Sequence, residues 1–274
     1  MKLATLRTES GSTMAAVDND GAWELLDAVD VGALLASPNY RTILDAPTGP
    51  ASAVEFAPVV LAPRKILCCG HNYRAHIEEM GRDTPQYPTL FAKFADTLVG
   101  AGDRISLPAC VTQFDWEAEL AVVVGATLRR AGRDEATEAI AGYTVANDLS
   151  ARDWQNRTPQ WLQGKAFDAT TPIGPVLVTP DEFDPGAGAK ITCSVNGEVR
   201  QTGSTDDLVF EAADLLAYIS EFTVLRAGDI VLTGTPSGVG AAATPPSFLQ
   251  SGDIVETAIE GIGVLRNIIG EDPR

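Results

Sequence analysis

The sequence predicts an α+β fold built on a mixed or antiparallel β-sheet. Short β-type runs recur along most of the chain, whereas few stretches repeat apolar residues with a helical spacing. The strands and helices do not alternate as βαβ units, and no GxGxxG, phosphate-binding loop, HExxH or GxSxG motif is present. These observations disfavour a doubly wound dinucleotide-binding fold.

The first 60 residues are predicted to form a small N-terminal domain. We expect strands near residues 1–8 and 13–20, a turn at residues 18–21 and a short helix at residues 31–35. Four prolines then fall between Pro47 and Pro63, where they exclude a helix interior or a central strand. The second domain should therefore cover residues 64–274.

The second domain is predicted to be rich in strands. Its β-type runs are RKILCCG, ELAVVVG, PIGPVLVT, KITCSVNG, DIVLTG and DIVETAIEG. Three Gly-Asp pairs, which end at Asp103, Asp229 and Asp253, lead into runs of this kind. We interpret them as turns, since glycine adopts positive φ and aspartate bonds to its own backbone.

Helical patterns are fewer in this domain. We expect helices over residues 72–80, 134–141 and 207–222. The third has three candidate N-cap residues just before it, namely Ser204, Thr205 and Asp206.

Composition and charge limit the classes of partner. The 274 residues are 45% hydrophobic and 21% charged, and 37 acidic against 20 basic residues give a net charge of -17. Without a cluster of lysine and arginine, nucleic acid and anionic membrane surfaces are excluded as expected partners. No signal peptide or 18-residue apolar stretch is found, so we expect a cytoplasmic protein. The four cysteines lack disulfide or zinc spacing and are expected to be reduced and mostly buried.

Two glutamates stand two residues apart at the start of an apolar run. Residues i and i+2 of a strand project to the same face, so Glu117 and Glu119 should be neighbours. A solvated strand face would explain such a pair, but the run AELAVVVG suggests that both faces become buried. Buried carboxylates pair, take up protons or bind a cation. With Asp148 as a third ligand, the set would suit Mg²⁺ or Mn²⁺ better than Zn²⁺.

Both histidines of the chain lie in one short stretch, CCGHNYRAHIEEMG. If this stretch is helical, His76 and Glu79 are three residues apart and can touch, whereas His71 and His76 point apart. A carboxylate bonded to one imidazole nitrogen orients the ring and strengthens the other nitrogen as a base. An exposed helix pair without consequence is the alternative.

Seven segments, in order from Gly70 to Gly240, resemble the fumarylacetoacetate hydrolase family, in particular its small bacterial members and the acylpyruvases. The segments are GHNYRAHIEEMG, PTLFAKFADTLVGAGDRISLP, FDWEAELAVVVG, GYTVANDLSARDWQ, QGKAFDATTPIGP, VNGEVRQTGSTDDLVF and LRAGDIVLTGTPSGVG. The resemblance implies a β-rich roll or sandwich as the catalytic domain, a small N-terminal domain and a homodimer. It also implies a divalent metal, Mg²⁺ or Mn²⁺, held at Glu117, Glu119 and Asp148.

The resemblance further implies roles for six other residues. His76 and Glu79 match a dyad on a mobile lid that activates water. Lys165 matches the active-site lysine, Gln155 a polar residue that positions water or substrate, and Arg152 a nearby basic residue. Thr235 matches the turn that holds the substrate carboxylate. His71 and Thr97 depart from the residues frequent at these places in the family, which leaves substrate identity open.

The function expected first is metal-dependent hydrolysis of a carbon-carbon bond in an acylpyruvate, such as fumarylpyruvate or acetylpyruvate. His76 would deprotonate a water that attacks the 4-carbonyl, and Lys165 would help to neutralise the pyruvate enolate. The same enolate-stabilising site would serve an oxaloacetate decarboxylase, or an isomerase of unsaturated dioxo acids in aromatic catabolism. A metal-binding protein without turnover is a further alternative, although it explains neither the dyad nor Lys165.

Overall fold

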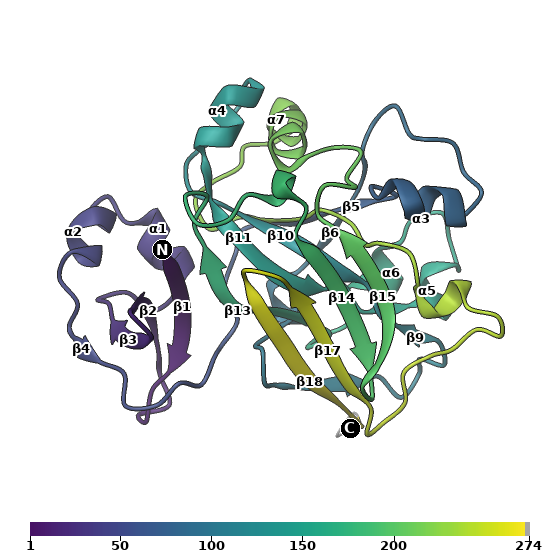
Figure 1. Cartoon of the computed structure of the whole chain (residues 1–274), viewed down its shortest axis with the longest axis horizontal. Coiled ribbons are helices and arrows are strands. Elements are labelled where there is room, and N and C mark those ends of the chain that lie inside the picture. Colours follow the sequence, from purple (N-terminus) through teal and green to yellow (C-terminus); the bar gives the residue numbers. More distant parts are fainter. Residues whose placement is uncertain (272–274) are drawn as a thin grey trace.

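The computed structural model describes residues 1–271 and contains two main β-sheets (Figure 1). The larger sheet has 11 strands in the order β4-β3-β2-β1-β13-β11-β10-β16-β5-β6, with β7 paired to β13. Its strands are β1 (Lys2–Arg7), β2 (Thr13–Asn19), β3 (Ala22–Leu25), β4 (Gly49–Pro50), β5 (Ile66–Gly70), β6 (Thr89–Lys93), β7 (Leu98–Val99), β10 (Ala118–Val124), β11 (Ile140–Asn147), β13 (Thr171–Val178) and β16 (Ile230–Leu232). Parallel pairs, β16 with β5 and β13 with β7, stand among antiparallel ones. The predicted mixed, strand-rich α+β fold is confirmed.

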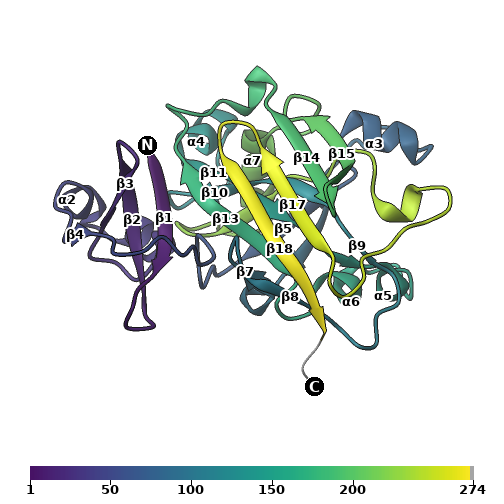
Figure 2. The same ribbon diagram turned by 60° about the horizontal axis from the view of Figure 1, so that its bottom comes forward.

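The second sheet has five strands in the order β15-β14-β17-β18-β8. They are β8 (Arg104–Leu107), β14 (Lys190–Val195), β15 (Glu198–Ser204), β17 (Ile254–Ile259) and β18 (Gly263–Glu271). Figure 2 shows this sheet lying across the larger one, and β18 and β17 contact β13 and β11 directly. The short strands β9 (Phe114–Asp115) and β12 (Ser150–Ala151) pair with each other beside the two sheets.

Seven α-helices flank the sheets in the described part of the chain. They are α1 (Val31–Ala36), α2 (Tyr40–Leu44), α3 (Arg74–Glu79), α4 (Arg133–Glu138), α5 (Arg152–Gln155), α6 (Leu162–Lys165) and α7 (Ala212–Phe222). Short 3₁₀ turns cover Ala95–Thr97, Pro185–Ala187 and Gly240–Ala242. No helix within residues 1–271 has the length and apolar character needed to cross a membrane.

Two helices have bounds that differ from the predicted ones. The third was expected from residue 207, with a cap at residues 204–206, but α7 begins at Ala212 with Glu211 as its N-cap. The residues before it are held extended, because Leu208 bridges to Tyr73 and the Val209 N–H donates to the Asn72 carbonyl. The helix expected over 134–141 ends at Glu138, where the chain enters β11.

The three Gly-Asp turns share one hydrogen bond. A carboxylate oxygen of Asp103, Asp229 or Asp253 accepts from the backbone N–H three residues earlier, at 2.6, 2.9 and 2.7 Å respectively. Each turn then leads into β8, β16 or β17. This local bond is the turn chemistry that the sequence predicts.

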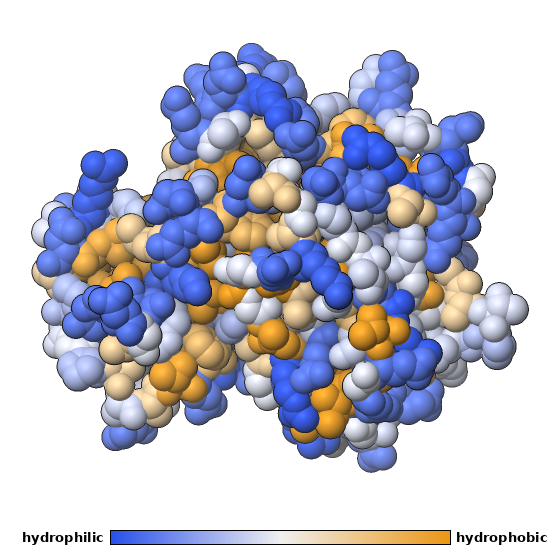
Figure 3. All heavy atoms as spheres, viewed as in Figure 1, coloured by the Kyte–Doolittle hydropathy of each residue, from blue (hydrophilic) through white to orange (hydrophobic). Residues whose placement is uncertain are grey.

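The N-terminal segment shares its sheet and its core with the rest of the chain. Strand β1 pairs antiparallel with β13, and Leu3, Leu26 and Val31 belong to the same buried cluster as Ile66 and Ala121. Figure 3 shows a mostly hydrophilic face, on which apolar residues form smaller groups, several of them near this junction. The division into domains 1–60 and 64–274 stays a prediction.

Candidate active site

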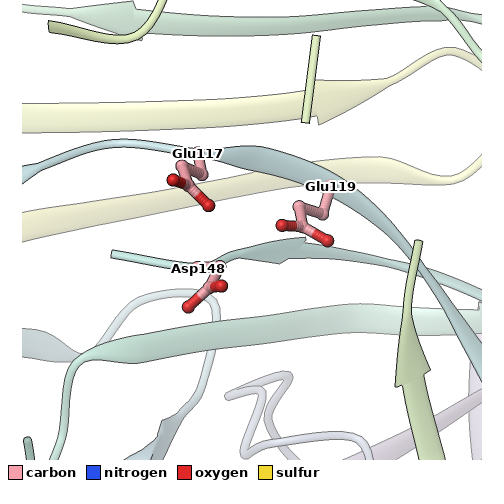
Figure 4. A group of neighbouring side chains, drawn as sticks. All are labelled: Glu117, Glu119 and Asp148. Atoms are coloured by element: carbon pink, nitrogen blue, oxygen red, sulfur yellow. The ribbon is translucent and has the colours of Figure 1, made fainter. Parts of the chain in front are cut away.

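Three carboxylates meet where β10 begins and β11 ends (Figure 4). Every residue of β10 is buried, which confirms that both faces of this apolar run are covered. Glu119 lies within β10 and Glu117 just before it, so both side chains leave the same face. Strand β11 runs antiparallel beside β10, and the Asp148 N–H donates to the Glu117 carbonyl at 2.9 Å. One oxygen from each carboxylate therefore lies within 4.8 Å of the others.

The pKa values of the two glutamates in this group are shifted in opposite directions. Burial, followed by the charges of Asp148 and Glu117, raises the pKa of Glu119 well above its usual range. Burial alone would do the same to Glu117, but Lys165 and Arg152 outweigh it and lower the pKa of Glu117 to about 2. Glu119 is thus the carboxylate whose charge is least compensated in the structure.

Two buried lysines hold Asp148. The Lys165 ammonium donates to Asp148 Oδ2 at 2.8 Å and to Glu117 Oε2 at 2.7 Å. Lys93 donates to Asp148 Oδ1 at 2.6 Å, and both partners of this bond are fully buried. Burial alone would lower the pKa of Lys165, but the charges of Asp148 and Glu117 raise it, so the ammonium stays charged. The enolate-neutralising role expected for Lys165 stays a prediction, and in the structure its charge is already paired.

Lys93 was not singled out in the sequence, although a lysine inside the apolar run TLFAKFA was a signal for a buried cation. Asp115 was missed as well. It accepts from Arg152 Nε at 2.8 Å and from the N–H groups of Trp116, Gly240 and Ala241. Its signal was the spacing, because Asp115 continues the alternation of Glu117 and Glu119.

Arg152, the first residue of α5, links this helix to Asp115 and Glu117. Its guanidinium contacts Glu117 Oε1 at 2.6 Å and donates to Gln155 Oε1 at 2.9 Å. Gly164 lets α6 approach α5, since a Cβ there would lie 2.5 Å from Gln155 Cβ. This close approach places Lys165 beside Glu117.

The α3 segment, residues 71–82, brings the imidazoles to the same site. His76 Nδ1 lies 2.9 Å from Glu79 Oε2, so the expected contact is present. The expectation that His71 and His76 point apart applies to a helix that includes both residues; this condition is not met, and both imidazoles line one pocket. The reason is that α3 begins only at Arg74, so His71 lies outside the helix and has a φ of 54°. Asn72 anchors the segment by donating to the carbonyls of Phe210 and Thr233.

Thr235 lies in the turn after β16. Its Oγ1 accepts from Gln201 Nε2 at 2.8 Å, and Gln201 Oε1 accepts from the Ala118 N–H. The preceding Gly234, at φ 104°, donates its N–H to Glu119 Oε2 at 2.6 Å. The turn therefore fixes the orientation of Glu119.

These elements enclose a cavity of about 210 Å³. Seven of the nine predicted site residues line the cavity: His76, Glu117, Glu119, Arg152, Gln155, Lys165 and Thr235. The other two contact residues of the lining, Glu79 through His76 and Asp148 through Lys165. Phe91 and Trp161 add an aromatic wall, with ring centroids 5.5 Å apart. The fold thus brings all nine residues into one site, while their individual roles stay predictions.

The donor set fits a divalent cation. Three buried carboxylates offer one oxygen each at mutual distances that a single ion can span, and all are hard oxygen ligands. The raised pKa of Glu119 reflects its burial and then repulsion from Asp148 and Glu117, and a cation would offset that repulsion. The residues that would hold the ion are Glu117, Glu119 and Asp148.

Comparison with known proteins identifies the relatives of this chain. A family model described as fumarylacetoacetate (FAA) hydrolase C-terminal matches residues 65–269. This chain belongs to the fumarylacetoacetate hydrolase family. The family uses a divalent metal in general, in agreement with the carboxylate group of this chain.

Members of the family with different activities resemble the chain. The human protein named oxaloacetate tautomerase FAHD2A, mitochondrial, is 46% identical over 223 residues, which are 81% of this chain and 71% of that protein. The structure of fumarylacetoacetate hydrolase from Exiguobacterium antarcticum has a TM-score of 0.88 at 34% identity, covering 99% of this chain and 100% of the other. A 5-carboxymethyl-2-hydroxymuconate delta-isomerase from Mycobacterium smegmatis has a TM-score of 0.82 at 32% identity, covering both chains fully.

Proposed function

We propose that this protein is a metal-dependent isomerase that interconverts the enol and keto forms of oxaloacetate. The observation that carries the proposal is the 46% identity, over 81% of the chain, to a protein named as an oxaloacetate tautomerase. The isomerase title of a structural neighbour supports the same reaction class. Acylpyruvate hydrolysis, the function expected first from the sequence, has weaker support from these relatives than the isomerase and decarboxylase alternatives.

The cation proposed for Glu117, Glu119 and Asp148 is Mg²⁺ or Mn²⁺. When bound, such an ion supplies Lewis-acid stabilisation of negative charge on a substrate oxygen. The buried carboxylates of this group and of Asp115 face three buried cations, Lys93, Arg152 and Lys165. When all are ionised, the four carboxylates and three cations together carry one net negative charge, and a bound divalent ion changes this to one net positive charge. The loaded site would therefore attract an anionic substrate.

Tautomerisation needs an acid-base group that moves a proton between carbon and oxygen. Formation of the keto form takes the proton from the enol oxygen and delivers it to carbon, and formation of the enol does the opposite. His76 suits this task because it lines the pocket while its Nδ1 is bonded to Glu79, which leaves Nε2 for the substrate. Glu79 also accepts from the Gly238 N–H at 3.2 Å, so it positions the ring relative to the turn after β16. Lys165 is the weaker candidate for the base, because its ammonium is paired with Glu117 and Asp148, whose charges raise the pKa of Lys165.

The test follows the ultraviolet absorbance of enol oxaloacetate while a coupled assay reports pyruvate. With Mg²⁺ or Mn²⁺, the enol should disappear without release of pyruvate, and excess chelator should abolish the reaction. Pyruvate release at the same rate as enol loss would instead make the protein a decarboxylase. If the protein consumes acylpyruvates but leaves oxaloacetate unchanged, the hydrolase function expected from the sequence is the correct one.

The dyad can be tested with two neighbouring glutamates of α3. Glu79→Gln should lower kcat by about 10- to 100-fold, which is part of the about 10²–10⁴-fold that an acid-base group contributes, because Glu79 positions His76 and is not the base itself. Glu78→Gln is the matched control, because Glu78 is exposed and lines no part of the pocket. Equal rates for the two variants would show that Glu79 does not assist His76 in the reaction.

A further inference from the structure

Three cations line the pocket, and two of them are already paired. Arg152 contacts Asp115 and Glu117 at 2.8 and 2.6 Å, and Lys165 contacts Glu117 and Asp148. Arg82 is the third, and its guanidinium has no ion pair or hydrogen bond to any residue in 1–271. It is therefore the charge that a ligand can engage without breaking a pair inside the protein.

His71 is a second polar group in this pocket without a partner. Both of its ring nitrogens are shielded from solvent and make no hydrogen bond within the described part of the chain. A neutral imidazole has one donor and one acceptor, and buried polar groups of this kind are almost always bonded. The ring packs edge-on against Trp161, with centroids 5.3 Å apart, so the pocket wall holds it in place.

The backbone at His71 is also unusual. Its φ of 54° lies in the left-handed region, which is uncommon and costly for a residue that is not glycine. Strain and unmet hydrogen bonds that coincide at a pocket indicate a ligand contact. Burial and then the charge of Arg82 lower the pKa of His71, so its imidazole is neutral and retains one N–H donor at neutral pH.

Arg82 and His71 flank α3, apart from the elements that carry the carboxylate group. His71 precedes the helix and Arg82 follows it, whereas Lys165 comes from α6 and Arg152 from α5. Figures 1 and 2 show α3 at the same end of the molecule as α5 and α6, and separated from them. The α3 segment thus adds polar groups to the pocket besides those that would hold the 2-oxo acid group.

We propose that Arg82 and His71 form a subsite for a second carboxylate, which makes the site selective for 2-oxo dicarboxylic acids over 2-oxo monocarboxylic acids. This inference deepens the proposed function and rests on it for the position of the 2-oxo acid group. Arg82 supplies a charge and a fork of N–H donors that match a carboxylate. His71 adds one N–H donor from the strained turn.

Calorimetry of the Mg²⁺-loaded protein with L-malate and L-lactate tests the subsite without turnover. The two acids share the 2-hydroxy acid group, and only malate has a second carboxylate. Wild type should bind malate more tightly than lactate. Arg82→Gln should weaken malate binding by about 10- to 100-fold, the range expected for a hydrogen bond to a charged group, and leave lactate within about twofold.

Three further variants make the result specific. Arg74→Gln removes the same charge from an exposed residue of α3 outside the pocket and should leave the malate-to-lactate ratio unchanged. Arg82→Lys should recover part of the lost affinity. His71→Asn should lower malate affinity less than Arg82→Gln, and asparagine tolerates the left-handed backbone. Melting temperatures measured alongside confirm that each variant is folded.

The outcomes separate this inference from the proposed function. If wild type binds malate no more tightly than lactate, or if Arg82→Gln behaves as Arg74→Gln does, the subsite is overturned even when the enzyme tautomerises oxaloacetate. If malate binding depends on Arg82 but oxaloacetate is not tautomerised, the subsite stands and the proposed reaction is wrong.

Discussion

At the scale of single residues, the site is defined by how its buried charges are compensated. Asp148 is bonded on one oxygen by Lys93 and on the other by Lys165. Glu117 is likewise paired with Lys165 and Arg152. Within residues 1–271, Glu119 accepts one hydrogen bond, from the Gly234 N–H, and pairs with no cation. Of the three carboxylates, only Glu119 therefore lacks a cation that compensates its charge.

We predict that Lys93→Met destabilises the metal-free protein by about 3–5 kcal/mol, because Asp148 Oδ1 loses its cation in a fully buried site and keeps only Lys165 on Oδ2. Both Lys93 and Asp148 are fully buried in this pair. Chemical denaturation in excess chelator gives the free energy of unfolding. Adding Asp148→Asn to Lys93→Met should recover much of the loss, since no unpaired charge remains; a double variant as unstable as the single one would contradict this explanation.

Metal affinity should rise with pH. In the metal-free protein the raised pKa of Glu119 keeps its carboxyl protonated at pH values where a free glutamate is ionised. A cation needs the carboxylate, so binding below this pKa releases a proton and is weakened, and above it the pH dependence levels off. Calorimetric titration of Mg²⁺ or Mn²⁺ in two buffers of different ionisation enthalpy detects the proton. Identical heats in both buffers would exclude its release.

At the scale of elements, the site depends on how closely short helices approach each other and the sheet. Helix α5 holds Arg152 and Gln155, and α6 ends at Lys165. Their contact is possible because Gly164 has no side chain, since a Cβ would lie 2.6 Å from the Gln155 N and 2.7 Å from the Ala151 O. The position of Lys165 thus follows from a packing constraint between two helices.

Gly164→Ala should therefore destabilise the protein by about 1–3 kcal/mol, as overpacking does in other proteins, and should lower activity by displacing Lys165. Gly102→Ala is the matched control, because a Cβ at residue 102 meets no atom within 4 Å. Thermal unfolding and the enol assay of both variants measure the difference. Equal behaviour of the two would show that α5 and α6 can separate without consequence.

At the scale of the whole molecule, the first 60 residues complete the larger sheet. Strand β1 covers the edge of β13, and the N-terminal apolar residues enter a cluster with β5, β10 and β16. The same sheet carries β10 and β11, whose ends form the carboxylate group. The N-terminal segment and the site are thus linked through continuous strands.

Removal of residues 1–63 should expose the β13 edge and part of the core, and so produce an aggregating chain. Size-exclusion chromatography and circular dichroism of residues 64–274 measure this outcome. A monodisperse fragment with a cooperative melting transition would instead support the predicted division into two independent domains.

We also propose that the protein is a homodimer, as its family resemblance implies. Light scattering should then give twice the chain mass of 28.9 kDa in solution. A single chain mass at all concentrations would contradict the proposal.

The sequence by itself determined the family, the strand-rich fold class and the carboxylate group. These depend on short-range patterns, because the alternation of a strand puts Glu117 and Glu119 on one face whatever lies around them. Only the tertiary structure decided which residues surround that face. Lys93 on β6 and Arg82 after α3 come from segments other than the one that carries Glu117 and Glu119, and the start of α7 is set by the pairing of Leu208 with Tyr73. Such contacts depend on how sheets and helices pack, and spacing along the chain carries no record of them.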